Sequence, residues 1–182
     1  PVSFSDAGDT AWYYNAVSFI GAREITLGIG NGLYGPDNQI IRGEFLVMLM
    51  RAYGIEPDAN PTDNFADAGD AYYTNCLAAA RRLGITKGIG NDLFAPNDCI
   101  SRQDMFVLLY RALDVLGELP EATGSSKLSN FADSGLIADY AQDALETFVA
   151  AGVVSGSGGM LLPAGLSTRA EMAQILYNLL SK

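Results

Sequence analysis

The sequence predicts an all-α protein made of three tandem copies of one helix–loop–helix unit. The first observation is a glycine-rich segment at residues 25–31 that recurs at 85–91 and, more loosely, at 153–159. The second is that the apolar residues after each copy recur with the period of an amphipathic helix, while no stretch alternates with the period of a half-buried strand. Repetition of this kind is the sequence signature of a repeat architecture.

Each unit opens with the motif Phe-x-Asp and continues into a first helix. The motif occurs as Phe4 with Asp6, Phe65 with Asp67, and Phe131 with Asp133. An aromatic residue follows in each copy, namely Trp12, Tyr72 and Tyr140. We expect this residue to open the first helix, at residues 12–23, 72–83 and 140–151.

A second helix follows the glycine-rich loop in each unit. A proline ends the loop, and an arginine comes six residues after it, as Arg42, Arg102 and Arg169. Apolar residues then fall at i, i+1, i+3, i+4, i+7 and i+8, which places one broad stripe on a helix of about three turns. Residues 101–104 and 168–171 have the spacing of a capping box, so these helices are expected to begin at the arginines.

Two linkers, at residues 56–64 and 117–130, separate the units, which we bound at 1–55, 62–116 and 128–182. A single two-helix unit cannot bury both of its apolar stripes, so the three units must share one core. Periodicity leaves open whether they stack in a line or close around an axis.

Composition excludes several classes of function. Of the 182 residues, 21 are acidic and 11 are basic, and the net charge of −10 would repel nucleic acid. The absence of histidine excludes Ser-His-Asp and Cys-His catalysis and any zinc site with an imidazole ligand. No apolar stretch approaches the roughly 20 residues of a membrane span, so no membrane insertion is expected. The first four residues lack the features of a signal peptide.

The loops and cysteines predict neither a cofactor nor a metal. The glycine-rich loop lacks the βαβ context of a nucleotide site. The Asp/Asn-rich stretches at 36–38 and 96–98 lack the ligand spacing of an EF-hand. Cys76 falls where the other repeats have alanine, which predicts a small buried residue. A disulfide between Cys76 and Cys99 stays open.

The three arginines call for a negative partner. Each is expected at the first position of a helix, where the macrodipole makes a cation unfavourable by about 0.3–1 kcal/mol. One candidate partner is an acidic side chain of a neighbouring unit, such as Asp6, Asp67 or Asp133. The other is an external anion, held by the guanidinium together with free backbone N–H groups. The sequence leaves both open.

These motifs together resemble the S-layer homology (SLH) module, in three copies that cover nearly the whole chain. Thr168-Arg169-Ala170-Glu171 matches the family box outright, residues 101–104 are a conservative variant, and residues 41–44 depart in two places. In the third loop, Leu162 takes the place of the aromatic residues Tyr34 and Phe94. The resemblance implies a pseudo-threefold, three-pronged spindle around a central helical bundle, with grooves between the prongs.

The resemblance also implies a non-enzymatic, monomeric anchor of the bacterial cell surface, held by a pyruvylated secondary cell-wall polysaccharide. In this family the box arginine contacts the ketal carboxylate, which implies Arg42, Arg102 and Arg169 as receptors. The other implied contacts are ring contacts from Trp12, Tyr72 and Tyr140, close backbone approach at Gly30, Gly90 and Gly158, and hydroxyl binding or support of the groove by Asp6, Asp67 and Asp133. The divergent third loop puts the groove of the third repeat in doubt.

Three other functions compete with this interpretation. A protein–protein or self-assembly module would pair the arginines with acidic residues of a partner. Direct recognition of peptidoglycan is a variant of the anchoring hypothesis. A glycosidase is disfavoured, because the acidic residues repeat with the fold units whereas glycoside hydrolysis needs one asymmetric carboxylate pair.

Overall fold

The described part of the chain, residues 3–181 of a computed structural model, is helical and contains no strand. Six α-helices are present: α1 (Tyr14–Ala22), α2 (Arg42–Ala52), α3 (Thr74–Arg82), α4 (Arg102–Leu116), α5 (Gln142–Ala150) and α6 (Arg169–Leu180). Three short 3₁₀ segments precede α5: η1 (Leu128–Asn130), η2 (Ser134–Leu136) and η3 (Asp139–Ala141). The all-α prediction is confirmed. The expected repeat bounds 1–55 and 128–182 include residues 1, 2 and 182, which lie outside the described residues.

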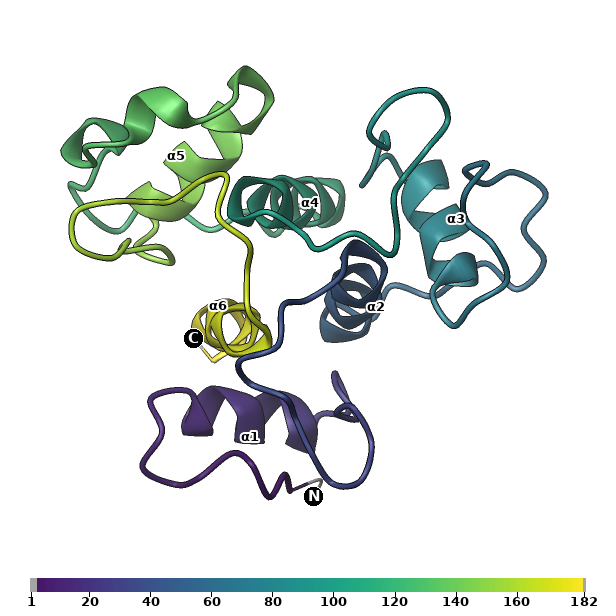
Figure 1. Ribbon diagram of the computed structural model, residues 1–182. Helices are drawn as coiled ribbons and strands as arrows, with labels where there is room; N and C mark the ends of the chain where they lie inside the picture. The colour runs from purple at the N-terminus through teal and green to yellow at the C-terminus, as the bar shows by residue number, and fades with distance from the viewer. Residues whose placement is uncertain (1–2, 182) are drawn as a thin grey trace.

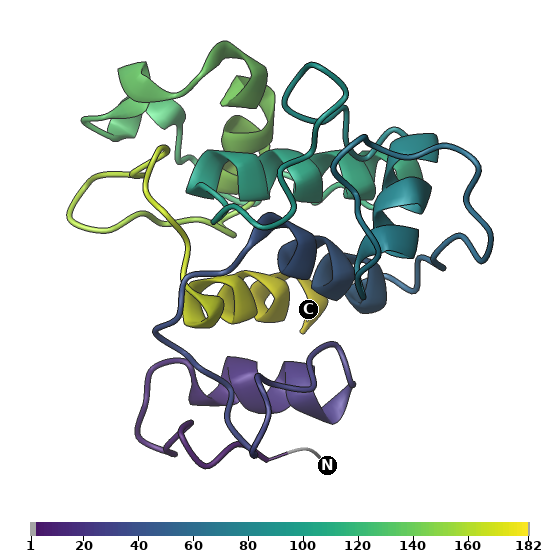
Figure 2. The same cartoon turned by 45° about the vertical axis from the view of Figure 1, so that its right-hand side comes forward.

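The second helices of the three repeats form the centre of the molecule. Figure 1 shows α2, α4 and α6 together in the middle, seen nearly end on, with α1, α3 and α5 outside them. Helix α3 packs on α2, α5 packs on α4, and α1 packs on α6; Figure 2 shows α1 running alongside α6. Each first helix therefore packs on the second helix of the preceding repeat, and the first repeat is completed by the last.

A ring of backbone hydrogen bonds joins the segments that lead into α2, α4 and α6. The N–H of Ile40 donates to the carbonyl of Ser167 (3.1 Å), that of Ser167 to Ile100 (3.1 Å), and that of Ile100 to Ile40 (2.9 Å). All three residues are fully buried. Every repeat thus gives one bond and receives one, so the shared core expected from the sequence is present and the third repeat returns to the first.

The second helices begin where the sequence predicted, at Arg42, Arg102 and Arg169. The first helices begin two residues later than expected, at Tyr14, Thr74 and Gln142. An aromatic residue, Tyr14, therefore opens α1, but the prediction that an aromatic residue opens the first helix is wrong for α3 and α5. Turns close ahead of the helices instead, for example where the N–H of Tyr14 donates to Ala11 and that of Thr74 to Ala71.

Two further sequence-based predictions concern the cysteines and membrane-spanning helices. Cys76 is buried and Cys99 is half-buried, and both are free thiols, so the predicted packing role of Cys76 is confirmed. None of the helices within residues 3–181 has the length and apolar character needed to cross a lipid bilayer.

Candidate functional site

The Phe-x-Asp motif shapes the loop that precedes each central helix. Both carboxylate oxygens of Asp6 accept backbone N–H bonds, from Tyr34 (2.7 Å) and Gly35 (2.8 Å). Asp67 binds Phe94 and Ala95 in the same way, and Asp133 binds Leu161 and Leu162. Burial alone would raise the pKa of the Asp6 and Asp133 carboxyl groups, but these backbone bonds outweigh burial and lower it. The aspartates therefore hold the loops in shape.

The phenylalanine of the motif explains the first glycine of Gly-x-Gly. Gly28 has φ 78°, and a Cβ there would lie 2.3 Å from the carbonyl of Leu33 and 2.6 Å from the ring of Phe4. The left-handed conformation and the close approach both require glycine. A Cβ at Gly88 would come equally close to the ring of Phe65, and a Cβ at Gly156 would come close to the ring of Phe131.

The hydrogen bonds of the aspartates correct the alignment of the third loop. Oδ1 of Asp133 accepts the N–H of Leu161, as Oδ1 of Asp6 accepts that of Tyr34. Leu161, which is buried, therefore corresponds to the aromatic position. The expectation that Leu162 occupies this position is wrong. The third loop is one residue shorter between Gly156 and Leu161 than its counterpart between Gly28 and Tyr34, which displaced the alignment.

Each box arginine is bonded to the next repeat. The Nε–H of Arg42 donates to the carbonyl of Phe94 (2.9 Å), and its Nη1 pairs with Asp104 (2.9 Å). Arg102 bonds Leu161 and Glu171 in the same way, with a longer ion pair of 3.4 Å. Arg169 closes the cycle with the carbonyl of Tyr34 and an ion pair to Glu44. The arginines thus lie at the junctions between repeats.

An internal acidic partner was one of the two predicted possibilities, but the residues named for it are wrong. Asp6, Asp67 and Asp133 have their oxygens on loop N–H groups, so the ion pairs use Glu44, Asp104 and Glu171. One of these three also serves as a cap, because Glu171 forms a complete capping box with Thr168. The box expected at residues 101–104 is only half formed: Ser101 accepts the backbone N–H of Asp104, but the Asp104 carboxylate does not cap the helix.

The backbone N–H groups beside the arginines are not free for an anion, contrary to the expectation. The N–H groups of Arg42 and Gly43 donate to carbonyls of Asp98 and Pro96, both at 2.9 Å. The first two N–H groups of α4 likewise donate to carbonyls within residues 163–165, and those of α6 donate to carbonyls within residues 36–38. An anion at these sites would be held by side chains.

The three arginines differ in accessibility. Arg169 is 1% exposed, and its Nε, Nη1 and Nη2 all have internal partners. Burial lowers the pKa of this guanidinium, against the opposing effects of Tyr34 and Asp6. Arg42 and Arg102 keep one terminal nitrogen, Nη2, that makes no hydrogen bond within residues 3–181, and both line a groove.

Three related grooves run beside the central helices. Groove 1 is lined by residues 26–29, by α2 and by Tyr72. Groove 2 is lined by residues 86–89, α4, Tyr140 and Arg42. Groove 3 is lined by residues 153–157 and 160–162, α6, Trp12 and Arg102. Each groove therefore combines the loop and central helix of one repeat with an aromatic residue of the next repeat, and grooves 2 and 3 add the arginine of the preceding one.

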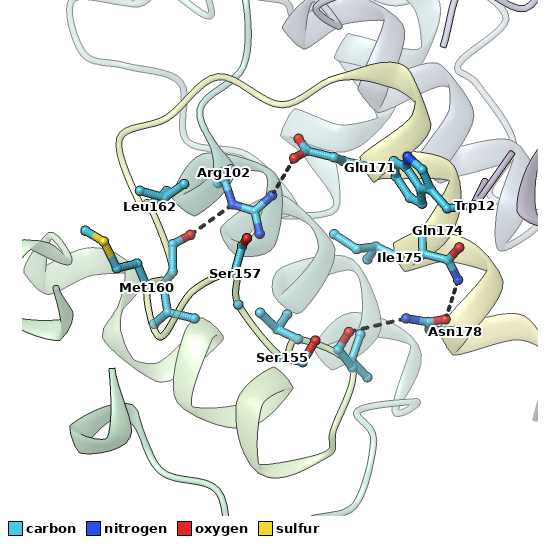
Figure 3. Close-up of a pocket in the computed structure, with 14 residues that line it drawn as sticks. Trp12, Arg102, Ser155, Ser157, Met160, Leu162, Glu171, Gln174, Ile175 and Asn178 are labelled. Carbon is cyan, nitrogen blue, oxygen red and sulfur yellow. Dashed lines mark hydrogen bonds and ion pairs between the residues drawn. The ribbon is translucent and has the colours of Figure 1, made fainter. Parts of the chain in front are cut away.

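In two of the three grooves, the structure brings a predicted aromatic residue together with a predicted arginine. Trp12, Tyr72 and Tyr140 are all more than half exposed and each lines one groove. Figure 3 shows Arg102 near the middle of groove 3, with Trp12 at one end and Met160 at the other. Arg169 does not line groove 1, although its partner Glu44 does. Gly30, Gly90 and Gly158 lie outside the groove linings, which contain Gly28, Gly88 and Gly156 instead.

Tyr140 also contacts the charged pair of groove 2. Its hydroxyl donates to Oδ1 of Asp104 (2.7 Å), whose other oxygen holds Arg42. Burial, followed by this bond and the charge of Asp104, raises the pKa of Tyr140 to about 12. The phenol is therefore neutral at physiological pH and keeps its ring fixed over the groove.

The sequence analysis missed a second set of groove residues. Nine positions after each box arginine lie Arg51, Arg111 and Asn178, and each lines its groove. At the loop side, Leu27, Lys87 and Ser155 occupy equivalent positions. The signal was present in the repeat register, as a position on each central helix that is polar in all three copies and falls outside the apolar stripe.

The chain matches the S-layer homology domain three times, at residues 3–46, 64–106 and 130–173. It is 31% identical over its whole length to exoglucanase XynX of Acetivibrio thermocellus, and covers 16% of that protein. It is 32% identical over 99% of its length to an amylopullulanase of Thermoanaerobacterium thermosulfurigenes, covering 10% of it. With S-layer protein sap of Bacillus anthracis it shares 25% identity over 96% of the chain, which is 21% of that protein.

The chain thus spans at most about a fifth of the length of these curated relatives, and the matched segment is what enzymes and S-layer proteins among them have in common. S-layer homology domains are cell-wall anchoring modules that bind cell-wall polysaccharide at the extracellular surface of bacteria. Each match covers the first helix and the loop of one unit and ends shortly after the box arginine, within the first five residues of the second helix. The chain therefore belongs to the S-layer homology family and consists of three tandem copies of its domain.

Proposed function

We propose that this chain anchors its protein to the cell wall by binding a pyruvylated secondary cell-wall polysaccharide, with groove 2 as the principal site. The observation that carries the proposal is the charge of this groove. Arg42, Lys87 and Arg111 line it against one carboxylate, that of Asp104, in a protein whose net charge is −10. Cations gathered in one hollow of an acidic surface form a local anion site, because screening confines the repulsion of distant charges to about 8–10 Å.

Within this groove, Nη2 of Arg42 is the proposed receptor of the ketal carboxylate. The bond from Nε to Phe94 and the ion pair to Asp104 fix the plane of the guanidinium and direct the remaining nitrogen. A planar group held in this way loses little side-chain freedom when it binds a carboxylate. Tyr140 offers an exposed ring for contact with the sugar, and Arg111 and Lys87 contribute positive potential.

The other predicted contacts take different roles in this proposal. Arg102 and Trp12 contact ligand in groove 3, and Tyr72 does so in groove 1, where Arg51 is the accessible cation. Arg169 supports groove 1 by holding Glu44, and the three motif aspartates hold the loops. Gly30, Gly90 and Gly158 shape the loop tips. No catalytic role, cofactor or metal is assigned.

The cyclic contacts support the finer architecture that the family implies. We propose that the module is a monomeric, pseudo-threefold spindle with three prongs, since α1, α3 and α5 each pack on a different central helix and the hydrogen-bond ring passes through all three repeats. Light scattering of the isolated module, with a monomer expected, would test the oligomeric state.

Calorimetric titration with purified wall polysaccharide, before and after mild acid removal of pyruvate, tests the proposed function. The pyruvate-dependent part of the binding should disappear when the pyruvate is removed, and binding of the intact polymer should weaken as salt is added. Arg42→Lys should weaken binding about tenfold, because an ammonium retains the ion pair but not the planar geometry. Arg82→Ala, which removes an exposed charge outside the three grooves, is the control and should bind as the wild type does.

Undiminished binding to the depyruvylated polymer would overturn the proposal. In that outcome, binding to purified peptidoglycan would favour direct recognition of that polymer. Association of the module with itself or with an envelope protein would favour an assembly role.

A further inference from the structure

We infer that groove 3 is a receptor for an uncharged N-acetylated sugar, distinct in chemistry from the anion site of groove 2. The inference rests on the proposed function in one respect, that the grooves bind wall carbohydrate. It adds a second ligand class within the same module, carried by residues that differ from their counterparts in groove 2.

Groove 3 lacks the cations that distinguish groove 2. Where groove 2 has Lys87 and Arg111, groove 3 has Ser155 and Asn178. Its remaining cation, Arg102, is matched by Glu171 at 3.4 Å. The charged side chains that line groove 3, Arg102 and Glu171, therefore sum to zero, whereas those of groove 2 sum to +2 (three cations and one carboxylate), so groove 3 attracts a negative ligand less strongly.

The polar groups of groove 3 are amides and hydroxyls, which suit sugar hydroxyl groups. The Nε2 of Gln174 donates to Oδ1 of Asn178 (2.8 Å), and Asn178 donates to the carbonyl of Val153 (3.4 Å). Figure 3 shows this chain along one side of the groove. It leaves Oε1 of Gln174 without a hydrogen-bond donor within residues 3–181, together with the hydroxyl of Ser155 nearby.

Trp12 supplies the ring contact. It is the single tryptophan of the chain and is 63% exposed. Its edge-to-face contact with Tyr13, with centroids 5.3 Å apart, holds the indole in place. A large flat apolar surface that needs no further hydrogen bond is suited to stack on the C–H face of a sugar ring.

The apolar wall of the groove specifies the sugar further. Groove 3 has a volume of about 230 Å³, compared with about 380 Å³ for groove 2. Ile175, Met160 and Leu162 line the groove and can pack against the methyl group of an acetamido substituent. The apolar wall therefore favours a sugar that carries an acetamido group.

The unique tryptophan makes the inference directly testable in the full module. Trp12 fluorescence is titrated with the methyl glycoside of N-acetylmannosamine and, separately, with the same sugar carrying a pyruvate ketal. The uncharged sugar should give a saturable change that salt does not affect. The ketal should produce the same change only at concentrations about tenfold higher or more, a difference of about 1.4 kcal/mol.

Two variants assign the response to the groove. Gln174→Ala/Asn178→Ala should abolish the fluorescence change while circular dichroism remains that of the wild type. Asn60→Ala, which removes an amide from an exposed linker, is the matched control and should leave the change intact.

Two results would overturn the inference: no response to the uncharged sugar, or a response to the ketal at lower concentration. Both are distinct from a failure of the proposed function, which is read calorimetrically as loss of the pyruvate-dependent binding of the polymer. Either hypothesis can therefore fail while the other stands.

Discussion

Grooves 2 and 3 share one backbone design but differ in chemistry. In both, an aspartate holds the loop, an arginine of the preceding repeat bonds the loop carbonyl, and an exposed aromatic residue closes one end. Groove 2 then adds Lys87 and Arg111, whereas groove 3 has Ser155, Asn178 and the smaller volume. The difference teaches that the repeated motif builds the same backbone frame in each groove, while unrepeated positions on its rim determine the charge of the groove.

The largest expected effect compares the two arginines as structural elements. Arg42→Ala should lower the free energy of unfolding by about 3 kcal/mol, because it leaves Asp104 without its cation at a junction where the arginine side chain is 7% exposed. Arg102→Ala should cost about 1 kcal/mol, since its ion pair is longer and more exposed. Urea unfolding followed by circular dichroism measures both values. Equal losses would show that the two junctions are energetically equivalent.

An exchange of the rim residues sharpens the comparison of ligands. Lys87→Ser/Arg111→Asn should weaken calorimetric binding of the pyruvate ketal about tenfold, because two exposed charge contacts are each worth up to about 1 kcal/mol. The reciprocal variant, Ser155→Lys/Asn178→Arg, should make Trp12 respond to the ketal at low salt. If the first variant binds as tightly as the wild type, the rim cations do not set the preference.

The smallest expected effect concerns the pH dependence of folding stability that Asp133 contributes in the third loop. The backbone hydrogen bonds hold the pKa of Asp133 in the folded state below its ordinary value of 3.8. The ionised carboxylate therefore stabilises the fold above pH 3.8, and this contribution is lost as the pH falls through the lower folded-state value. Asp133→Asn should therefore reduce the acid sensitivity of the unfolding free energy measured between about pH 5 and pH 2. A slope identical to that of the wild type would mean that other carboxylates dominate acid unfolding.

The sequence was sufficient to predict the repeats, the all-α class, and the starts of α2, α4 and α6 at their arginines, because glycine placement and apolar spacing are local signals. It could not show that Asp104 is the partner of Arg42, since this pairing depends on how the repeats pack. Leu162 was misplaced for a different reason, because the third loop was aligned from its glycines and is one residue short. Alignment from Pro163 gives Leu161, which the bonds of Asp133 confirm.

The residues that line each candidate groove were harder to predict from the sequence. Each contains an aromatic residue from the next repeat, so Trp12, near the start of the chain, lines a groove with α6 near its end. The contributions of Arg111 and Asn178 follow from the repeat register, but their importance depends on the groove they face. The net negative charge of the chain also concealed the local basic site, since net charge carries no information on where individual charges lie.

The ring formed by Ile40, Ile100 and Ser167 uses only main-chain groups, which every amino acid except proline supplies in full. Substitutions on the surface can therefore accumulate separately in each repeat without loosening the joint that holds the three together. A domain triplicated in this way keeps its architecture while its copies diverge, and one small module can present several different receptors to the same polymer.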